Sequence, residues 1–502
     1  MPVLVVDLDG TLIRSDSLYE TFWAGMAEDW GTALAALRAL TSGRAALKKS
    51  MAGRTVLEPE HLPYNTVVLD YVRDWRANGG RAVLVTAADG SIASAISDHL
   101  GLFDEAHGSD GQHNLKGAAK ARFLEERFGA GGFAYIGDSA ADLPVWDASA
   151  KSVSVDASPA LQRQVAAQGG DSEHLQSGTK SGYLAALRPH QWLKNVLVFV
   201  PLVAAQSFTG LHILNTILAF VAFSLVSSSG YLLNDLMDLR ADRAHPRKCK
   251  RPLAAGRVPI AHGTAMMPLL LLAGLLTAFI AGPNLLGVIF GYFVLTTVYS
   301  TWLKQRAVAD IGTLAGLYTL RIIAGGVATG LGLSVWLLAF SMFFFFALAA
   351  VKRLAELVDL EKRGIRTATR RGYHVEDAPL ISQMTTASGY ISVLVLALYV
   401  NTNAVQQLYT APWLLWGICL VLMYWISRVV LVTHRGKMED DPIVYAIRDR
   451  TSLVRILLVV AFAVAASPGS RNAMIGAVIV TVVVLVAVFA PWLGLADPYK
   501  GS

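Results

Sequence analysis

Residues 211–242 read LHILNTILAFVAFSLVSSSGYLLNDLMDLRAD, an apolar run that ends in a cluster of carboxylates. The apolar part is long enough to cross a bilayer as a helix, which takes about 20 residues. Asn234 opens the cluster, and Asp235, Asp238 and Asp242 follow at helical spacing, on one face of a continuous helix. Carboxylates gathered at the end of a membrane span repel one another unless a cation lies between them. The stretch therefore predicts a membrane protein with a metal site at its surface.

Similar apolar runs recur from about Trp192 to the end of the chain, separated by short polar loops. About nine spans are expected; the runs at 193–208 and 453–466 are short, and the last run covers 473–495. Lys and Arg gather in alternate loops, such as 240–257 and 352–371, while 281–284 and 330–334 carry none. This positive-inside pattern predicts that the basic loops lie in the cytoplasm, below the plasma membrane. It also explains the net charge of +6 without a nucleic-acid partner.

The first 185 residues have the charge content and short apolar runs of a soluble domain. The chain starts with a strand-like MPVLVVDLDG rather than a basic start and a long apolar stretch, so no signal peptide is expected and this domain should stay in the cytoplasm. Cys249 and Cys419 suggest no disulfide framework. The expected division is an α/β domain at 1–156 with a helical cap at about 16–64, a polar linker at 157–186, and an all-α membrane domain at 187–502.

The N-terminal strand 3–6 runs directly into Asp7-Leu8-Asp9-Gly10-Thr11. Side chains alternate along a strand, so Asp7 and Asp9 share one side, and Gly10 permits a sharp turn. This pattern resembles the first motif of the haloacid dehalogenase superfamily. The resemblance implies that Asp7 is a nucleophile that takes a phosphoryl group. It also implies that Asp9 protonates the leaving alcohol and later deprotonates water.

Three further stretches match that superfamily in order. Thr86 ends a strand at 81–85, and the resemblance implies that its hydroxyl binds phosphate. Lys116, in Asn-Leu-Lys-Gly, would neutralise phosphate charge and hold the nucleophile. The strand 133–136 leads to Asp138 and Asp142, which are hard oxygen ligands of the kind that Mg²⁺ prefers. The resemblance implies a Rossmann-like sheet with a phosphatase site at the carboxyl ends of its strands, where the metal ligands are Asp7, Asp9, Asp138 and Asp142.

The acidic cluster at 234–242 is followed by His-Pro-Arg-Lys at 245–248 and by Arg251-Pro-Leu. Together these residues resemble the first aspartate motif of UbiA prenyltransferases. Tyr299, Lys304 and Asp310 then follow the fourth span as they do in that superfamily. The resemblance implies a UbiA fold in which Mg²⁺ holds the diphosphate of a donor substrate on Asn234, Asp235, Asp238 and Asp242.

The region after the sixth span departs from the aromatic-acceptor members of that superfamily, which carry a second aspartate motif there. This chain has Lys352, Arg353 and Glu356 instead, and resembles the decaprenyl-phosphate phosphoribosyltransferase branch. That branch takes phosphoribosyl pyrophosphate as donor and a polyprenyl phosphate as acceptor. Glu356 would orient the ribose or a basic partner. Arg321 sits within an apolar stretch, where a charge is costly in lipid, so an interior role is expected. The phosphate-binding candidates are Lys194, Lys248, Arg251, Tyr299, Lys304, Arg321, Lys352 and Arg353, although topology alone also accounts for Lys352 and Arg353.

The two halves fit one sequence of reactions, because the transfer product carries a ribose 5-phosphate that a phosphatase on the same membrane face can remove. The product is then a polyprenyl-phosphoryl-ribose for cell-envelope or glycolipid pentose donors. One alternative is a prenyltransferase with a prenyl diphosphate donor and an aromatic acceptor, beside an unrelated or regulatory N-terminal domain. Another is a membrane part that only transports or anchors. The sequence leaves a homo-oligomer open.

Overall fold

The structure is a computed structural model that describes residues 2–467 except 56, 111–113, 179–181, 365–371, 439–441, 443–444 and 447–448. The chain divides into two compact units. Of the described residues, the first unit contains 2–187 and Tyr231–Met267, and the second contains Arg188–Gly230 and 268–467. The first unit thus combines the α/β domain with a segment from the middle of the chain.

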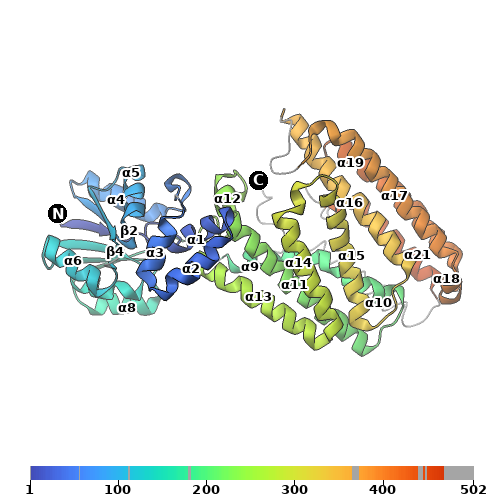
Figure 1. Cartoon of the computed structure of the whole chain (residues 1–502), viewed down its shortest axis with the longest axis horizontal. Coiled ribbons are helices and arrows are strands. Elements are labelled where there is room, and N and C mark those ends of the chain that lie inside the picture. Colours follow the sequence, from blue (N-terminus) through green and yellow to red (C-terminus); the bar gives the residue numbers. More distant parts are fainter. Residues whose placement is uncertain are drawn as a thin grey trace. The chain divides into compact units, whose positions relative to one another are not determined.

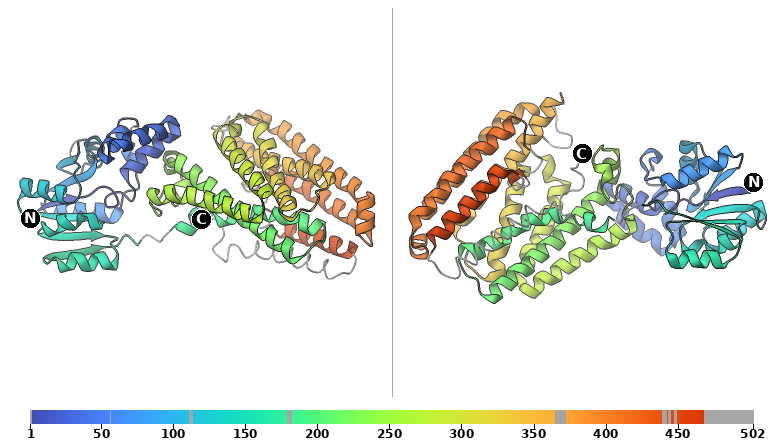
Figure 2. Two further views of the ribbon diagram at one scale, coloured as in Figure 1. Left: turned by 60° about the horizontal axis from the view of Figure 1, so that its bottom comes forward. Right: turned by 180° about the vertical axis from the view of Figure 1, so that it is seen from behind.

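A parallel six-stranded sheet forms the centre of the α/β domain, in the order β3-β2-β1-β4-β5-β6. The register places Val5 of β1 beside Val83 on one side and Tyr135 on the other. Helices lie on both sides of the strands (Figures 1 and 2). The predicted Rossmann-like α/β fold is therefore confirmed. The strands are β1 (Val3–Val6), β2 (Ala82–Asp89), β3 (Glu105–Ser109), β4 (Phe133–Gly137), β5 (Lys151–Val155) and β6 (Asp171–Leu175).

Alternation along β1 supplies a core to each face of the sheet. Leu4 and Val6 face one apolar cluster, which α4 (Thr66–Ala77) and α5 (Gly90–Leu100) complete. Val5 faces the opposite cluster, which α6 (Ala118–Phe128), α7 (Leu143–Asp147) and α8 (Pro159–Ala167) complete. Because both faces are covered, the inner strands β1 and β4 and the first half of β2 read as continuous apolar runs. The carboxyl ends of β1 and β4 meet at one edge, where the acidic motifs begin.

Three helices follow β1 and form the expected cap: α1 (Ser17–Glu28), α2 (Gly31–Thr41) and α3 (Arg44–Ala52). Asp16 caps α1, because its carboxylate accepts hydrogen bonds from the backbone N–H groups of Leu18 and Tyr19. The chain then returns to the sheet domain through a short 3₁₀ turn, Pro59–His61.

The stretch 157–186 differs from the polar linker that the sequence predicts. It contains α8 and β6, and β6 pairs in parallel with β5 from Lys151 to Val155. Only Leu161 and Val165 of α8 are buried, and β6, with the sequence DSEHL, lies at the edge of the sheet. An edge strand with few buried side chains has little apolar periodicity, so its sequence resembles a linker.

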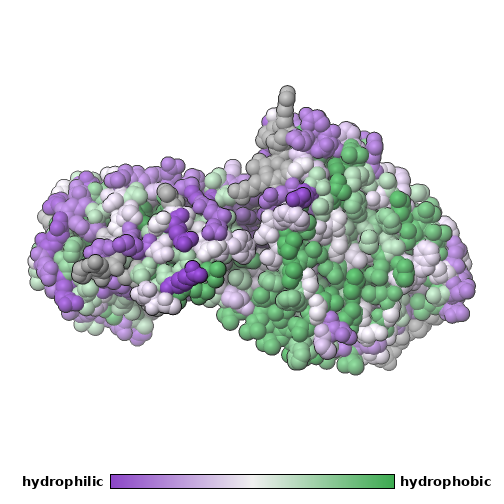
Figure 3. Space-filling view, viewed as in Figure 1, coloured by the Kyte–Doolittle hydropathy of each residue, from purple (hydrophilic) through white to green (hydrophobic). Residues whose placement is uncertain are grey.

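The described membrane part is all-helical, as predicted, and the face of it seen in Figure 3 is largely apolar. Within the described residues, seven helices are long and apolar enough to cross a bilayer. The expected first run forms a 3₁₀ helix, Pro189–Phe199, followed by the short α10 (Val200–Ala204), rather than one long helix. The run at 453–466 lies in α21 (Arg450–Ala466), and the run at 473–495 lies outside the described residues. The seven helices are α11 (Gly210–Met237), α13 (Ile260–Ala281), α14 (Pro283–Thr301), α15 (Ala309–Thr329), α16 (Val335–Lys362), α17 (Ala378–Val400) and α19 (Trp416–His434).

Candidate active sites

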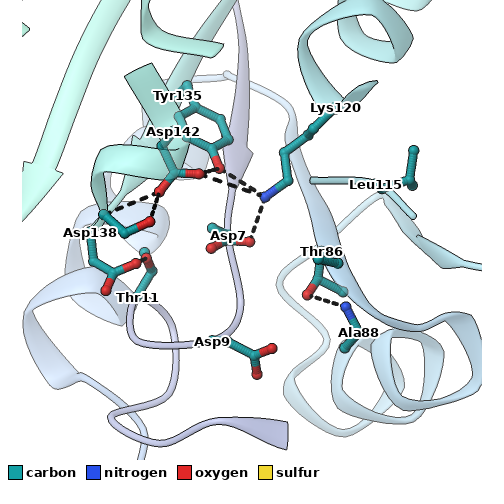
Figure 4. Close-up of polar contacts among 12 residues, drawn as sticks. Asp7, Asp9, Thr11, Thr86, Ala88, Leu115, Lys120, Tyr135, Asp138 and Asp142 are labelled. Atoms are coloured by element: carbon teal, nitrogen blue, oxygen red, sulfur yellow. Dashed lines mark hydrogen bonds and ion pairs between the residues drawn. The ribbon is translucent and has the colours of Figure 1, made fainter. Parts of the chain in front are cut away.

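Three carboxylates converge at the carboxyl ends of β1 and β4 (Figure 4). Asp7, Asp138 and Asp142 each offer one oxygen, and these oxygens all lie within 4.8 Å of one another. Gly10 makes room for them, because a Cβ built on it would come within 2.4 Å of an Asp138 oxygen. No other group of three acidic, histidine or cysteine side chains in the described part of the chain comes this close. The two motifs that the sequence placed at separate strand ends thus form one site.

Burial and mutual repulsion disfavour negative charge in this site. Burial raises the pKa of Asp7, although Lys120 opposes the rise, and burial together with Asp7 raises the pKa of Asp138 to about 8. A divalent cation among these oxygens would remove the penalty, and a set of carboxylates is the donor type that Mg²⁺ prefers. The donors present therefore fit Mg²⁺, with Asp7, Asp138 and Asp142 as its ligands.

The lysine that contacts the nucleophile candidate is Lys120, not Lys116 as expected. Lys120 is buried on α6, and its Nζ lies 2.7 Å from Asp7 Oδ1, 2.9 Å from the Tyr135 hydroxyl and 4.0 Å from Asp142 Oδ1. Lys116 is exposed in the loop before α6. The two lysines lie one helical turn apart in sequence, so only the packing of α6 against the sheet decides which of them reaches Asp7.

Asp9 lies outside the group of converging metal-site oxygens, and its carboxylate binds Ser17, the first residue of α1. Its carboxylate accepts hydrogen bonds from the Ser17 backbone N–H at 2.8 Å and from the Ser17 hydroxyl at 3.1 Å. Burial, with the nearby negative charge of Asp16, raises the pKa of Asp9 to about 7. A carboxyl group with this pKa exchanges protons readily near neutral pH, as the expected acid–base role requires. The structure does not place Asp9 among the three converging metal-ligand oxygens, where the sequence had also counted it.

Two further residues lie near Asp7 and Asp9: Thr86 of β2, which was expected, and Lys48 of the cap, which was not. Thr86 is fully buried, and its hydroxyl accepts a hydrogen bond from the Ala88 N–H at 3.0 Å. Lys48 of α3 donates to the Ala87 carbonyl at 2.7 Å. Burial lowers its pKa, while Asp9 and Asp16 oppose the change. Sequence reasoning missed Lys48, because one lysine among the basic residues of the cap gives no signal.

The acidic cluster at the end of α11 is arranged differently from the single helical face that its spacing predicts. The helix ends at Met237, and Asp238 precedes a separate short helix, α12 (Leu239–Ala244). Asp235 and Asp242 are both buried, and burial raises the pKa of Asp242 although Arg251 opposes the rise. Arg251 Nη1 donates to Asp235 Oδ1 at 3.1 Å and to Asp242 Oδ2 at 2.5 Å. The guanidinium thus lies where the expected cation would otherwise offset these two charges.

The remaining members of this motif lie near the surface of the first unit. Asn234 and Asp238 are half-buried, and Lys248 is exposed. Carboxylate oxygens and one amide oxygen form a donor set that suits Mg²⁺. The residues present are therefore compatible with the metal, provided that Arg251 moves off the carboxylates.

The second unit contains a buried ionic network around Arg353. Its Nε donates to Asp310 Oδ2, and its Nη1 donates to Glu356 Oε2 at 2.6 Å. The Tyr299 hydroxyl accepts from its Nη2 at 3.2 Å. Tyr373 donates to the other oxygen of Asp310 at 2.5 Å. Arg353 was expected to bind substrate phosphate, but its side chain is fully engaged within the protein.

Arg321, on α15, is also buried as expected, but its partners are neutral. Its Nε donates to Asn195 Oδ1 at 2.9 Å and its Nη2 donates to the Tyr292 hydroxyl at 3.0 Å. The rings of Phe223, Tyr292 and Tyr318 lie around the guanidinium, at 5.0–5.7 Å from their centroids. Such contacts stabilise a desolvated cation, so Arg321 joins helices rather than facing solvent. Lys194, Lys304 and Lys352, by contrast, are only half-buried.

Comparisons with known proteins match both halves of the chain. The sequence model of the UbiA prenyltransferase family matches residues 195–447, and that of the haloacid dehalogenase-like hydrolases matches residues 4–147. An uncharacterized protein of Sinorhizobium fredii, y4nM, is 39% identical over 92% of this chain and 90% of its own. The nodulation protein NoeC of Azorhizobium caulinodans is 38% identical over 55% of this chain and 90% of its own. The decaprenyl-phosphate phosphoribosyltransferase of Mycobacterium tuberculosis is 33% identical over 54% of this chain and 89% of its own.

Proposed function

Because the chain belongs to the UbiA prenyltransferase family, we propose that its membrane domain moves 5-phosphoribose from phosphoribosyl pyrophosphate to a polyprenyl phosphate. The similarity to the mycobacterial decaprenyl-phosphate phosphoribosyltransferase carries this proposal, since it extends over 89% of that enzyme. The stretch at 352–371, where aromatic-acceptor members carry their second aspartate motif, supports the proposal as well. Basic side chains there suit an anionic acceptor and a 5-phosphate better than an aromatic acceptor.

In the proposed transfer, a phosphate oxygen of the lipid attacks C1 of the ribose. The bond from C1 to the pyrophosphate oxygen breaks, and pyrophosphate leaves. Asn234, Asp235, Asp238 and Asp242 would hold Mg²⁺, which would supply positive charge to stabilise the departing anion. With a metal on these carboxylates, Arg251 would be released from Asp235 and Asp242 and could neutralise the diphosphate. The half-buried or exposed lysines assigned to substrate phosphates are Lys194, Lys248, Lys304 and Lys352.

We further propose that the N-terminal domain removes the 5-phosphate of the transferred ribose. The Asp7 carboxylate attacks phosphorus and forms an acyl phosphate, while Asp9 gives its proton to the departing 5-oxygen. Asp9 then takes a proton from the water that attacks the acyl phosphate, and inorganic phosphate is released. Lys120 positions Asp7 through its hydrogen bond to the carboxylate. The Thr86 hydroxyl would donate a hydrogen bond to the phosphate. The convergence of Asp7, Asp138 and Asp142 is the observation that carries this step.

Mass spectrometry of the lipid product tests both steps together. Membranes containing the whole chain receive phosphoribosyl pyrophosphate, polyprenyl phosphate and Mg²⁺. Wild type should give polyprenyl-phosphoryl-ribose, and Asp7→Asn should give the same lipid with one additional phosphate. Asp235→Asn should give neither lipid. An identical product from wild type and Asp7→Asn would exclude the phosphatase step while leaving the transfer intact.

A prenyl diphosphate donor with an aromatic acceptor is the competing function within the same family. It predicts that the product contains no ribose and that labelled phosphoribosyl pyrophosphate leaves no label in the lipid. The residues around Arg353 argue against it, because the place of a second aspartate motif is taken by Lys352, Arg353 and Glu356. Both functions need the basic loops and the N-terminal domain in the cytoplasm, where phosphorylated substrates are found.

A further inference from the structure

Helix α2 of the cap turns its large apolar side chains outward. Trp30, just before the helix, is 53% exposed, and Leu34, Leu37 and Leu40 are 62%, 62% and 52% exposed. The positions 30, 34 and 37 lie on one face of a helix. Thr32, on the opposite face, is buried. The helix therefore packs its small and polar side against the rest of the cap. Its tryptophan and leucine side chains form an exposed apolar stripe on the other side.

The segment around this stripe is strongly basic. From residue 30 to residue 57 the chain contains Arg38, Arg44, Lys48, Lys49 and Arg54 and no Asp or Glu. Arg38, Lys49 and Arg54 are exposed. A helix with a Trp and Leu face and flanking Lys and Arg is the pattern of helices that lie in the plane of a membrane, where the cations meet anionic lipid headgroups.

The cap is also fixed to the ends of two membrane helices within the first unit. Arg243 of α12, which directly follows Asp242, donates to both oxygens of Glu20 at 2.8 and 2.6 Å, and both side chains are buried. Trp23 of α1 donates from its indole N–H to the Thr264 hydroxyl of α13 at 2.8 Å. Both α11 and α13 are long and apolar enough to cross a bilayer, so a bilayer surface is expected where α11 ends and α13 begins, which puts the attachment of the cap at the depth of the headgroups.

From these three observations we propose that α2 lies in the headgroup layer of the membrane, with its leucines directed toward the acyl chains. The occupant of the exposed stripe is thus the lipid bilayer itself. A large exposed apolar stripe is rare on a protein surface that faces water, and anionic lipid matches the charge of this segment. This inference is independent of the transfer reaction.

Spin labelling of the whole chain in nanodiscs of phosphatidylcholine and phosphatidylglycerol tests the proposal. Cys249 and Cys419 are replaced by serine, and a nitroxide is attached through Leu34→Cys, Leu37→Cys or, as an aqueous control, Glu126→Cys on the exposed side of α6. Collisions with the water-soluble relaxer nickel ethylenediaminediacetate should be several-fold rarer at 34 and 37 than at 126, while collisions with oxygen should be more frequent.

Two results would overturn the proposal. Equal exposure of positions 34 and 126 to the nickel relaxer would show that the stripe faces water. Protection accompanied by dipolar broadening, which dilution with unlabelled protein removes, would assign the stripe to a second copy of the chain. Neither readout depends on catalysis, so failure here is distinguishable from failure of the proposed transfer.

Discussion

Replacement of Arg353 by methionine should destabilise the membrane domain rather than only weaken substrate binding. Met is long and flexible enough to fill much of the volume, but it removes every hydrogen bond of the guanidinium. Asp310 is then left fully buried, with Tyr373 as its remaining side-chain donor among the residues that the structure describes. Breaking a buried ion pair in this way typically costs 3–5 kcal/mol. Protonating an ordinary carboxyl group at pH 7 instead costs about 4 kcal/mol.

The change can be measured by thermal unfolding of the purified protein, followed by tryptophan fluorescence in detergent. A loss of this size should lower the midpoint by roughly 6–12 °C. Arg363→Met is the matched control, because Arg363 caps the same helix and pairs with Asp359 at the exposed surface. Such a pair contributes about 0–1 kcal/mol. The double variant Arg353→Met with Asp310→Asn should recover part of the loss, since the fully buried residue 310 then carries no charge, while Glu356 is partly exposed.

One result would contradict this reasoning. If Arg353→Met unfolds at the wild-type temperature yet loses transfer activity, the guanidinium contributes to substrate binding. The network around Asp310 then does not stabilise the membrane domain.

Three further predictions concern the first unit and the metal. Lys120→Met should lower phosphatase activity at least 100-fold, whereas Lys116→Met should change it far less, as measured with the isolated lipid 5-phosphate; equal losses would contradict the contact between Lys120 and the nucleophile. Glu20→Gln should make the cap more accessible to limited proteolysis, because it breaks the buried pair with Arg243, while Asp70→Asn, which breaks the exposed pair with Arg73, should leave the cleavage rate unchanged; similar digestion of wild type and both variants would refute this. Removing divalent cations with EDTA should abolish both reactions, and Mg²⁺ should restore both; activity that persists without the metal would exclude its proposed role.

The sequence predicted those parts of the site that depend on local pattern. Asp7 and Asp138 directly follow buried strands, and parallel strands bring their carboxyl ends to one edge, so the meeting of these residues required no tertiary information. The same holds for the helical cap and for the apolar membrane helices. In each case one short stretch carries both the periodicity and the functional residue.

Contacts between distant residues were beyond this kind of inference. Arg353 reaches Asp310 across 43 residues, and Arg321 reaches Asn195 across 126. Nothing in the spacing of these residues indicates that the cations are enclosed by protein rather than directed to substrate. The break after Met237 was missed for a related reason, since Arg251 draws Asp235 and Asp242 together from outside the helix.

The position of the sixth strand limits how far the proposed phosphatase domain can reach from the segment that follows it. Because β6 ends at Leu175 and the next helix starts at Tyr183, only a short connector joins the sheet to the following segment. The eight Cα–Cα steps from Leu175 to Tyr183 span at most about 29 Å when the chain is fully extended. Under the proposed function, such a short connection favours lipids made by the same polypeptide over those released by its neighbours, so phosphorylated intermediates should seldom accumulate free in the leaflet.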